Sequence, residues 1–171
     1  MIKSKKSLGQ NFLIDKNIIK KIINSADIEN KTILEVGPGT GNLTSEIIKK
    51  KPKKLIVVEK DDNLAINLEN TFNNQITIIN NDILKIDETN LFKNNDKVTV
   101  FGNLPYNIST EILNKWIINL NDNFWFECLV LMFQKEVANR IIGKFNTKDY
   151  GRLSIICNWK LNIKKICDIK P

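Results

Sequence analysis

The fold is decided by residues 31–51, KTILEVGPGTGNLTSEIIKKK, in which three kinds of local structure follow one another. The first seven residues, KTILEVG, have the β-branched and apolar composition of a buried strand that runs into a turn. The glycines predict a tight turn, and GNLTSEIIKKK is typical of a helix that ends before Pro52. A strand, a turn and a helix in this order form the repeating unit of a parallel sheet.

The same unit recurs along the chain. A first helix is expected after Asp15, whose side chain can cap it, with Ile18, Ile19, Ile22 and Ile23 on its apolar face. Further strands are predicted at residues 54–60, 75–82, 97–103, 126–134 and 153–170, and further helices at residues 61–72, 109–120 and 135–143. The alternation predicts an α/β fold with a mostly parallel, twisted sheet and helices on both faces, in one domain spanning residues 1–171.

Composition narrows the possible functions. The chain has no His, which excludes Ser-His-Asp catalysis and His-ligated metal sites, and we expect no metal. Cys128, Cys157 and Cys167 lack metal-ligand spacing and fit free thiols in a reducing cytoplasm. No run approaches the roughly 20 apolar residues of a membrane helix, and no feature calls for an oligomer, so we expect a monomer. The net charge of +7 favours a polyanionic partner such as nucleic acid.

Polar or glycine-rich features follow three successive predicted strands. Gly37, Gly39 and Gly41 follow the first strand and allow the backbone to approach a ligand closely. Glu59 ends the second strand, where a carboxylate can accept hydrogen bonds from both ribose hydroxyls. Asp82 ends the third, where a carboxylate can accept from an adenine amine. Together they suit an adenosine-containing cofactor, and they leave nicotinamide and S-adenosylmethionine both open.

The fourth predicted strand runs into FGNLPYNIST, residues 101–110. Methyl transfer to an adenine amine needs the nitrogen lone pair to leave the ring system, which two acceptors for the N–H groups can promote. The Asn103 side-chain oxygen and the Leu104 carbonyl, held by the rigid ring of Pro105, are suitable acceptors. Tyr106 offers a face on which an extruded base can stack. This segment favours S-adenosylmethionine over nicotinamide and predicts catalytic roles for all four residues.

Five segments together resemble one known family. GQNFL (residues 9–13), EVGPGTGNLT, GNLPYNIST, QKEVANRI (residues 134–141) and YGRLS (residues 150–154) occur in this order over essentially the whole chain. They are similar to the KsgA-type small-subunit ribosomal RNA adenine N6,N6-dimethyltransferases, which have a Rossmann-like methyltransferase fold. The Erm-type methyltransferases of large-subunit RNA are similar in design, and GPGTGNLT, NLPYNIST and YGRLS favour the KsgA type.

The resemblance implies further roles. It implies cofactor contacts at Asn11 and Leu13, Gly37 at the amino-acid portion, Glu59 at the ribose and Asp82 at the adenine, with Asn103 between cofactor and target base. It implies dimethylation of two adjacent adenosines, with the small ribosomal subunit and its RNA as partners. The region after the fifth strand helps shape the RNA-facing surface in this family. The candidate RNA contacts are Lys3, Lys5, Lys6, Lys135 and Arg140.

The family also extends beyond the position of Pro171. Its members add a Phe- and Pro-containing loop, a last antiparallel strand and a small helical domain. We therefore expect the chain to be the catalytic domain of such a protein, incomplete at its C-terminal end.

Three other functions agree less well with the sequence. A nicotinamide oxidoreductase would carry Gly at position 42, where this chain has Asn, and would not need the Asn-Leu-Pro-Tyr segment. A non-catalytic RNA-binding assembly factor could use the same surface, but the intact Asn103, Pro105 and Tyr106 favour retained chemistry. A DNA adenine methyltransferase usually has a second Pro where Leu104 lies.

Overall fold

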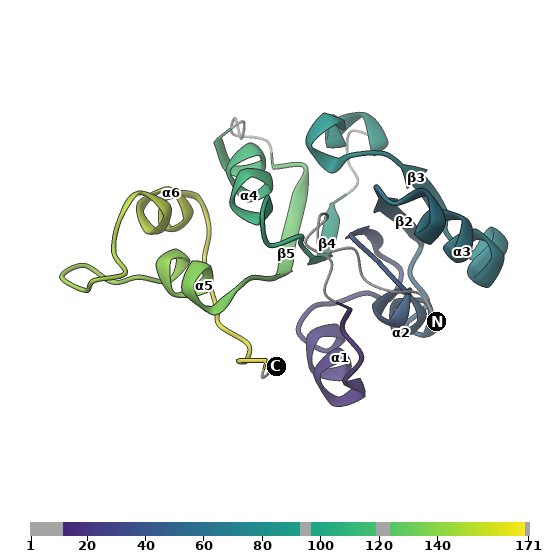
Figure 1. Ribbon diagram of the computed structural model, residues 1–171, viewed down its shortest axis with the longest axis horizontal. Coiled ribbons are helices and arrows are strands. Elements are labelled where there is room, and N and C mark those ends of the chain that lie inside the picture. Colours follow the sequence, from purple (N-terminus) through teal and green to yellow (C-terminus); the bar gives the residue numbers. More distant parts are fainter. Residues whose placement is uncertain (1–11, 93–96, 119–123, 170–171) are drawn as a thin grey trace.

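The sheet is the centre of the fold. The computed structural model describes residues 12–92, 97–118 and 124–169 (Figure 1). Its five strands are β1 (Thr32–Val36), β2 (Lys54–Glu59), β3 (Thr77–Asn80), β4 (Val98–Asn103) and β5 (Phe126–Met132). All neighbouring pairs are parallel, in the order β3-β2-β1-β4-β5. The sheet therefore reverses its strand order beside β1, and in such α/β sheets ligands bind at the carboxyl ends of the strands flanking this point.

Side chains that alternate along the strands build two apolar layers. Ile33, Val57 and Phe101 pack on one face with α1 (Lys16–Ile23), α2 (Asn42–Lys49) and α3 (Asp62–Phe72). Leu34 and Val100 pack on the other face with α4 (Ser109–Ile118). Every residue of β1 is buried, which explains why its sequence lacks a polar face. The predicted α/β architecture, with helices on both faces of a parallel sheet, is confirmed.

The helix starts follow the capping residues in the sequence. Asp15 Oδ1 accepts hydrogen bonds from the backbone N–H of Asn17 and Ile18, as predicted. Asp61 caps α3 in the same way, through Asn63 and Leu64. Three short 3₁₀ turns complete this part of the chain, at Asn73–Gln75 (η2), Ile83–Lys85 (η3) and Glu88–Leu91 (η4). Among the described residues, no helix has the length and apolar character needed to cross a membrane.

The strand predicted at residues 153–170 is wrong. The first part of this segment is helix α6 (Arg152–Lys160), which follows α5 (Lys135–Ile141), and residues 161–169 form neither helix nor strand. Leu153 and Cys157, four positions apart, pack against Leu113 and Ile117 of α4, so the helical period decides the structure. Ser154 Oγ accepts from the Gly151 N–H at 2.8 Å and fixes the start of α6.

Candidate active site

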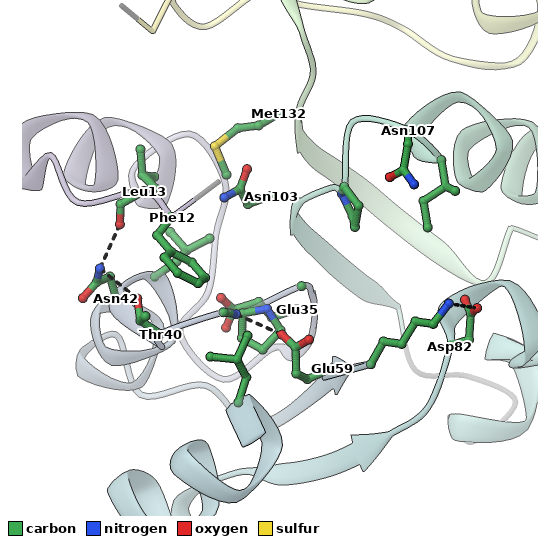
Figure 2. A pocket seen from close by; sticks show the side chains of 18 of the residues that line it. Phe12, Leu13, Glu35, Thr40, Asn42, Glu59, Asp82, Asn103, Asn107 and Met132 are labelled. Carbon is green, nitrogen blue, oxygen red and sulfur yellow. Dashed lines mark hydrogen bonds and ion pairs between the residues drawn. The ribbon is translucent and has the colours of Figure 1, made fainter. Parts of the chain in front are cut away.

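A pocket lies at the carboxyl edge of the sheet, where the strand order reverses (Figure 2). The glycine loop after β1, the ends of β2, β4 and β5, and the segment after β3 all contribute to it. Its lining consists of Phe12, Leu13, Glu35, Gly37, Pro38, Gly39, Thr40, Asn42, Leu43, Glu59, Lys60, Leu64, Asp82, Leu84, Asn103, Pro105, Asn107, Ile108 and Met132. The polar features predicted at four separate strand ends therefore face one cavity.

The glycine loop is in a conformation that ordinary side chains resist. Gly37 and Gly39 have φ of +69° and +58°. A Cβ added to Gly37 would lie 3.1 Å from the carbonyl oxygen of Asn103, so glycine lets the β1 and β4 ends approach each other. Gly41 differs in position, because it precedes α2, faces Phe72 and is not among the pocket-lining residues.

The carboxylate of Glu59 holds the loop in place. Its Oε2 accepts from the Gly39 N–H at 3.1 Å (Figure 2). Its Oε1 accepts from the Asp61 N–H at 2.9 Å. Burial raises the pKa of Glu59, and these N–H donors offset part of the rise. Glu59 therefore fixes the start of α3 and the glycine loop while its side chain lines the pocket.

Glu35 brings a second carboxyl group to the same wall of the pocket (Figure 2). It lies on β1 and is 1% exposed, and its Oε2 is buried with no hydrogen-bond partner among the described residues. Burial, aided by the nearby charge of Glu59, raises the pKa of Glu35 to about 8. A buried acceptor without a partner is suited to a donor group of a ligand.

Asp82 lies at the opposite side of the pocket, after β3. Its Oδ1 accepts from the Leu84 N–H at 3.0 Å, and its Oδ2 pairs with the Lys60 ammonium at 2.8 Å (Figure 2). The hydrogen bond from Lys60 lowers the pKa of Asp82, so this group carries a negative charge. Asp82 therefore offers acceptor oxygens at a fixed position.

The Asn-Leu-Pro-Tyr segment divides its residues between pocket and core. Asn103 is the last residue of β4, and it lines the pocket together with Pro105. The Leu104 side chain is buried in the core on the α4 face of the sheet. Tyr106 is partly buried and not among the pocket-lining residues; its carbonyl accepts from Ser109 Oγ at 3.3 Å, at the start of α4.

The beginning of the described chain closes one side of the pocket. Phe12 faces Gly39, where an added Cβ would lie 2.9 Å from the Phe12 ring. Asn42 Nδ2 donates to the Leu13 carbonyl at 2.9 Å, which ties this segment to the glycine loop (Figure 2). The predicted contact at Leu13 therefore lies at the pocket, whereas Asn11 lies outside the described residues.

The candidate RNA contacts lie elsewhere or outside the described chain. Lys135 and Arg140 are exposed on α5 and do not line the pocket. Helices α5 and α6 lie at the opposite end of the molecule from α3 (Figure 1). Lys3, Lys5 and Lys6 lie outside the described residues.

The chain is similar to a known protein family, and this similarity agrees with the pocket described above. The family model of ribosomal RNA adenine dimethylase matches residues 1–171. The chain belongs to the ribosomal RNA adenine dimethylase family. This confirms the resemblance predicted from the five sequence segments.

Two members named for the small subunit illustrate the range of identity within the family. Ribosomal RNA small subunit methyltransferase A of Pelagibacter ubique is 65% identical over 99% of this chain. The protein of the same name from Wolbachia pipientis wMel is 44% identical over the whole chain. The chain spans 64% and 59% of the lengths of these curated relatives.

Solved structures show the same fold. A dimethyladenosine transferase from Plasmodium falciparum superposes with a TM-score of 0.79 at 30% identity, covering 92% of this chain and 55% of that one. The 23S rRNA methyltransferase ErmE superposes with a TM-score of 0.66 at 27% identity, covering 86% of this chain and 55% of that one. The predicted Rossmann-like methyltransferase fold is confirmed.

Sequence reasoning missed several pocket residues. Glu35 had a visible signal, an acidic residue inside an otherwise apolar strand. Asn42 was noted only as the residue that replaces a glycine of the dinucleotide fingerprint, although it bonds to Leu13. Lys60 and Phe12 had no local signal, because their places at the pocket depend on residues distant in the sequence, Asp82 and Gly39.

Proposed function

We propose that this chain transfers methyl groups from S-adenosylmethionine to N6 of two adjacent adenosines in small-subunit ribosomal RNA. The product is N6,N6-dimethyladenosine, and the reaction is a step of ribosome biogenesis. The observation that carries the proposal is the convergence of Glu59, Asp82 and Asn103, from three different strand ends, on one pocket.

The residues present fit S-adenosylmethionine. The molecule carries a positive amino group, two ribose hydroxyls and an adenine amine, all of which donate hydrogen bonds. The pocket offers the carboxylates of Glu59 and Asp82 for these donors, together with the buried Glu35 carboxyl oxygen that has no partner among the described residues. Glu59 would hold the ribose, Asp82 the adenine amine and Gly37 the amino-acid portion. Asn11 and Leu13 would cover the cofactor, and Gly39 and Gly41 shape the loop beside it.

The Asn-Leu-Pro-Tyr segment would prepare the target base. When bound, S-adenosylmethionine supplies a methyl group that its sulfonium charge activates for in-line displacement. The Asn103 side chain and the Leu104 carbonyl would accept the two N–H groups of the target adenine and direct its lone pair away from the ring. Pro105 would hold the carbonyl in place, and Tyr106 would stack on the base.

Two features favour the small-subunit RNA as substrate. The name of the 65% identical Pelagibacter ubique relative specifies the small subunit. The segments NLPYNIST and YGRLS are those that favour the KsgA type over the Erm type. The structural similarity to ErmE keeps large-subunit RNA as the alternative substrate. A non-catalytic RNA-binding assembly factor is the alternative function.

Basic residues support the binding of RNA. Lys135 and Arg140, together with Lys3, Lys5 and Lys6, are proposed phosphate contacts, in keeping with the net charge of +7. The partner is then the small ribosomal subunit. All three cysteines are free thiols, which suits the reducing cytoplasm, and we propose that the chain acts there as a monomer.

The proposal is tested by incubating the chain with labelled S-adenosylmethionine and small ribosomal subunits that lack the adenosine methylations. Mass spectrometry of digested RNA should find the label as N6,N6-dimethyladenosine. Large-subunit RNA in a parallel reaction should remain unlabelled, and label there instead would identify the Erm-type activity. S-adenosylhomocysteine binding without transfer to either RNA would support the cofactor pocket and would contradict methyl transfer by these 171 residues by themselves.

A further inference from the structure

The segment that carries Asp82 lies at the edge of the sheet. It follows β3, the outermost strand on that side, and consists of the two short turns η3 and η4. Asp82 caps η3 through the Leu84 N–H, and Ile83 and Ile86 pack in the apolar layer of α4. The Asp82 carboxylate pairs with Lys60, whose side chain is itself largely exposed, so the backbone of this edge segment still needs an anchor to the rest of the fold.

Lys115 of α4 reaches across and provides this anchor. Its ammonium donates to the Ile83 carbonyl at 2.8 Å, to the Ile86 carbonyl, and to Glu88 Oε1 at 2.8 Å. An ammonium has three N–H donors, and each of them has an acceptor here. Asp82 caps the N-terminal end of the η3 turn, and Lys115 binds the carbonyl groups at its C-terminal end.

Glu88 and Trp116 complete the network. Glu88 is 4% exposed, and its Oε1 also accepts from the Trp116 indole N–H at 2.6 Å. Removing one member of such a buried network leaves a charged group without its partner, which costs more than the net gain of the bond. The turn from Ile83 to Glu88 is therefore held to α4 by two adjacent residues of that helix.

The same helix begins directly after the Asn-Leu-Pro-Tyr segment. Ile108 N–H donates to the Pro105 carbonyl at 3.1 Å, and Ile112 N–H to the Ile108 carbonyl, so the segment continues into α4. One rigid element thus contacts both the segment proposed for the target base and the segment proposed for the adenine of the cofactor.

We propose that Lys115 is a positioning residue which, through Ile83, Ile86 and Glu88, places the Asp82 carboxylate for recognition of the exocyclic amine of the cofactor's adenine. The inference rests on the proposed function, because it requires an adenosine-containing cofactor in this pocket. Lys115 touches neither cofactor nor substrate. By fixing the position of Asp82, Lys115 makes the pocket prefer adenine over a base that lacks the exocyclic amine.

The test compares two ligands in the same chain by isothermal titration calorimetry. S-adenosylhomocysteine offers the amine to Asp82, whereas S-inosylhomocysteine presents an oxygen that cannot donate. In the Lys115→Met variant, the affinity ratio of the two ligands should fall about tenfold, the loss expected for a misplaced hydrogen bond to a charged group. A merely structural role would lower the melting temperature without changing this ratio in the folded protein.

Two further variants make the assignment specific. Asp82→Asn should lower the same ratio, and adding Lys115→Met to it should lower the ratio no further, because both changes act on one interaction. Lys85→Met is the matched control. It removes an exposed positive charge from the same turn, and it should leave the ratio within about twofold of the unaltered chain if anchoring rather than charge is responsible.

The outcomes separate the inference from the proposed function. No S-adenosylhomocysteine binding by the unaltered chain would overturn the proposed function, and this inference with it. Binding with an unchanged ratio in Lys115→Met would overturn the inference alone. If that variant does not fold, Glu88→Gln decides. It keeps an acceptor for Trp116 but weakens the attraction to Lys115, so an unchanged ratio overturns the inference and a ratio lowered about threefold supports it.

Discussion

Two parts of the molecule differ in how they use their aromatic and charged side chains. The described residues of 12–132, here the N-terminal part, line the whole pocket and bury carboxyl groups such as Glu35 and Glu59 inside it. The described residues of 133–169, the C-terminal part, contribute nothing to the pocket and leave the aromatic side chains of Phe145 and Trp159 about three-quarters exposed, more than the 44% of Phe124 in the N-terminal part. A close-packed parallel sheet holds the polar groups of a pocket at fixed positions. The two short helices that pack near α4 line no pocket of this kind and do not need such fixed polar groups.

The difference predicts that chemistry depends on the N-terminal part. Asn103→Ala should lower the rate of methyl transfer by about a hundred- to a thousandfold, because a preorganised acceptor for the reacting amine is lost. The affinity for S-adenosylhomocysteine should fall much less. Single-turnover rates with labelled S-adenosylmethionine and undermethylated small subunits measure the effect. Asn17→Ala, an exposed asparagine on α1, is the control, and an equal rate in Asn103→Ala would remove that residue from the proposed mechanism.

The buried carboxyl of Glu35 predicts a pH dependence. Because its pKa is raised from 4.5 to about 8 in the folded chain, the folded state binds more protons than the unfolded state between about pH 4.5 and pH 8. Stability should therefore fall as pH rises through this interval. Glu35→Gln should reduce the slope to the smaller one expected from Glu59, and should raise the free energy of unfolding near pH 8 by about 1–3 kcal/mol.

Urea unfolding of the ligand-free chain at several pH values makes this measurement. Glu136→Gln, on the exposed side of α5, is the control from the C-terminal part and should keep the original slope. The same slope in Glu35→Gln would show that Glu35 is not protonated in the folded chain.

Two glycines give a matched comparison between the parts. Gly37→Ala should destabilise the fold by about 1–2 kcal/mol, because its φ of +69° is in the left-handed region and the new Cβ meets the Asn103 carbonyl. Gly151→Ala should be tolerated, since that backbone is extended and nothing lies within 4 Å of an added Cβ. Thermal unfolding of both variants checks the pair, and equal melting temperatures would contradict it.

The range of an interaction along the chain decides how much the sequence could predict. Strands β1 to β5 and their helices were predicted because apolar runs, caps and glycines act locally, and Glu59, Asp82 and Asn103 followed from their places at strand ends. The strand at 153–170 was wrong because residues such as Ile155, Ile156 and Trp159 have strand propensity, while packing of Leu153 and Cys157 on α4 favours a helix. Lys115 and Lys60 could not be found, because their partners lie 22 to 32 positions away in the chain.

Replacing Trp159 should change the free energy of unfolding less than the other substitutions change what they affect. It also tests whether the exposed side chains of the C-terminal part are free of packing. The residue is 73% exposed, and the Lys160 ammonium lies 4.3 Å from the centroid of its ring. Such exposed cation–π contacts contribute about 0.5–1 kcal/mol, so Trp159→Ser should change the free energy of unfolding by no more than this. Urea unfolding monitored by far-ultraviolet circular dichroism measures the change without relying on the fluorescence of the ring that is removed. A loss above about 2 kcal/mol would mean that this helix face is packed in solution, and the C-terminal part would then resemble the N-terminal part in its use of aromatic side chains.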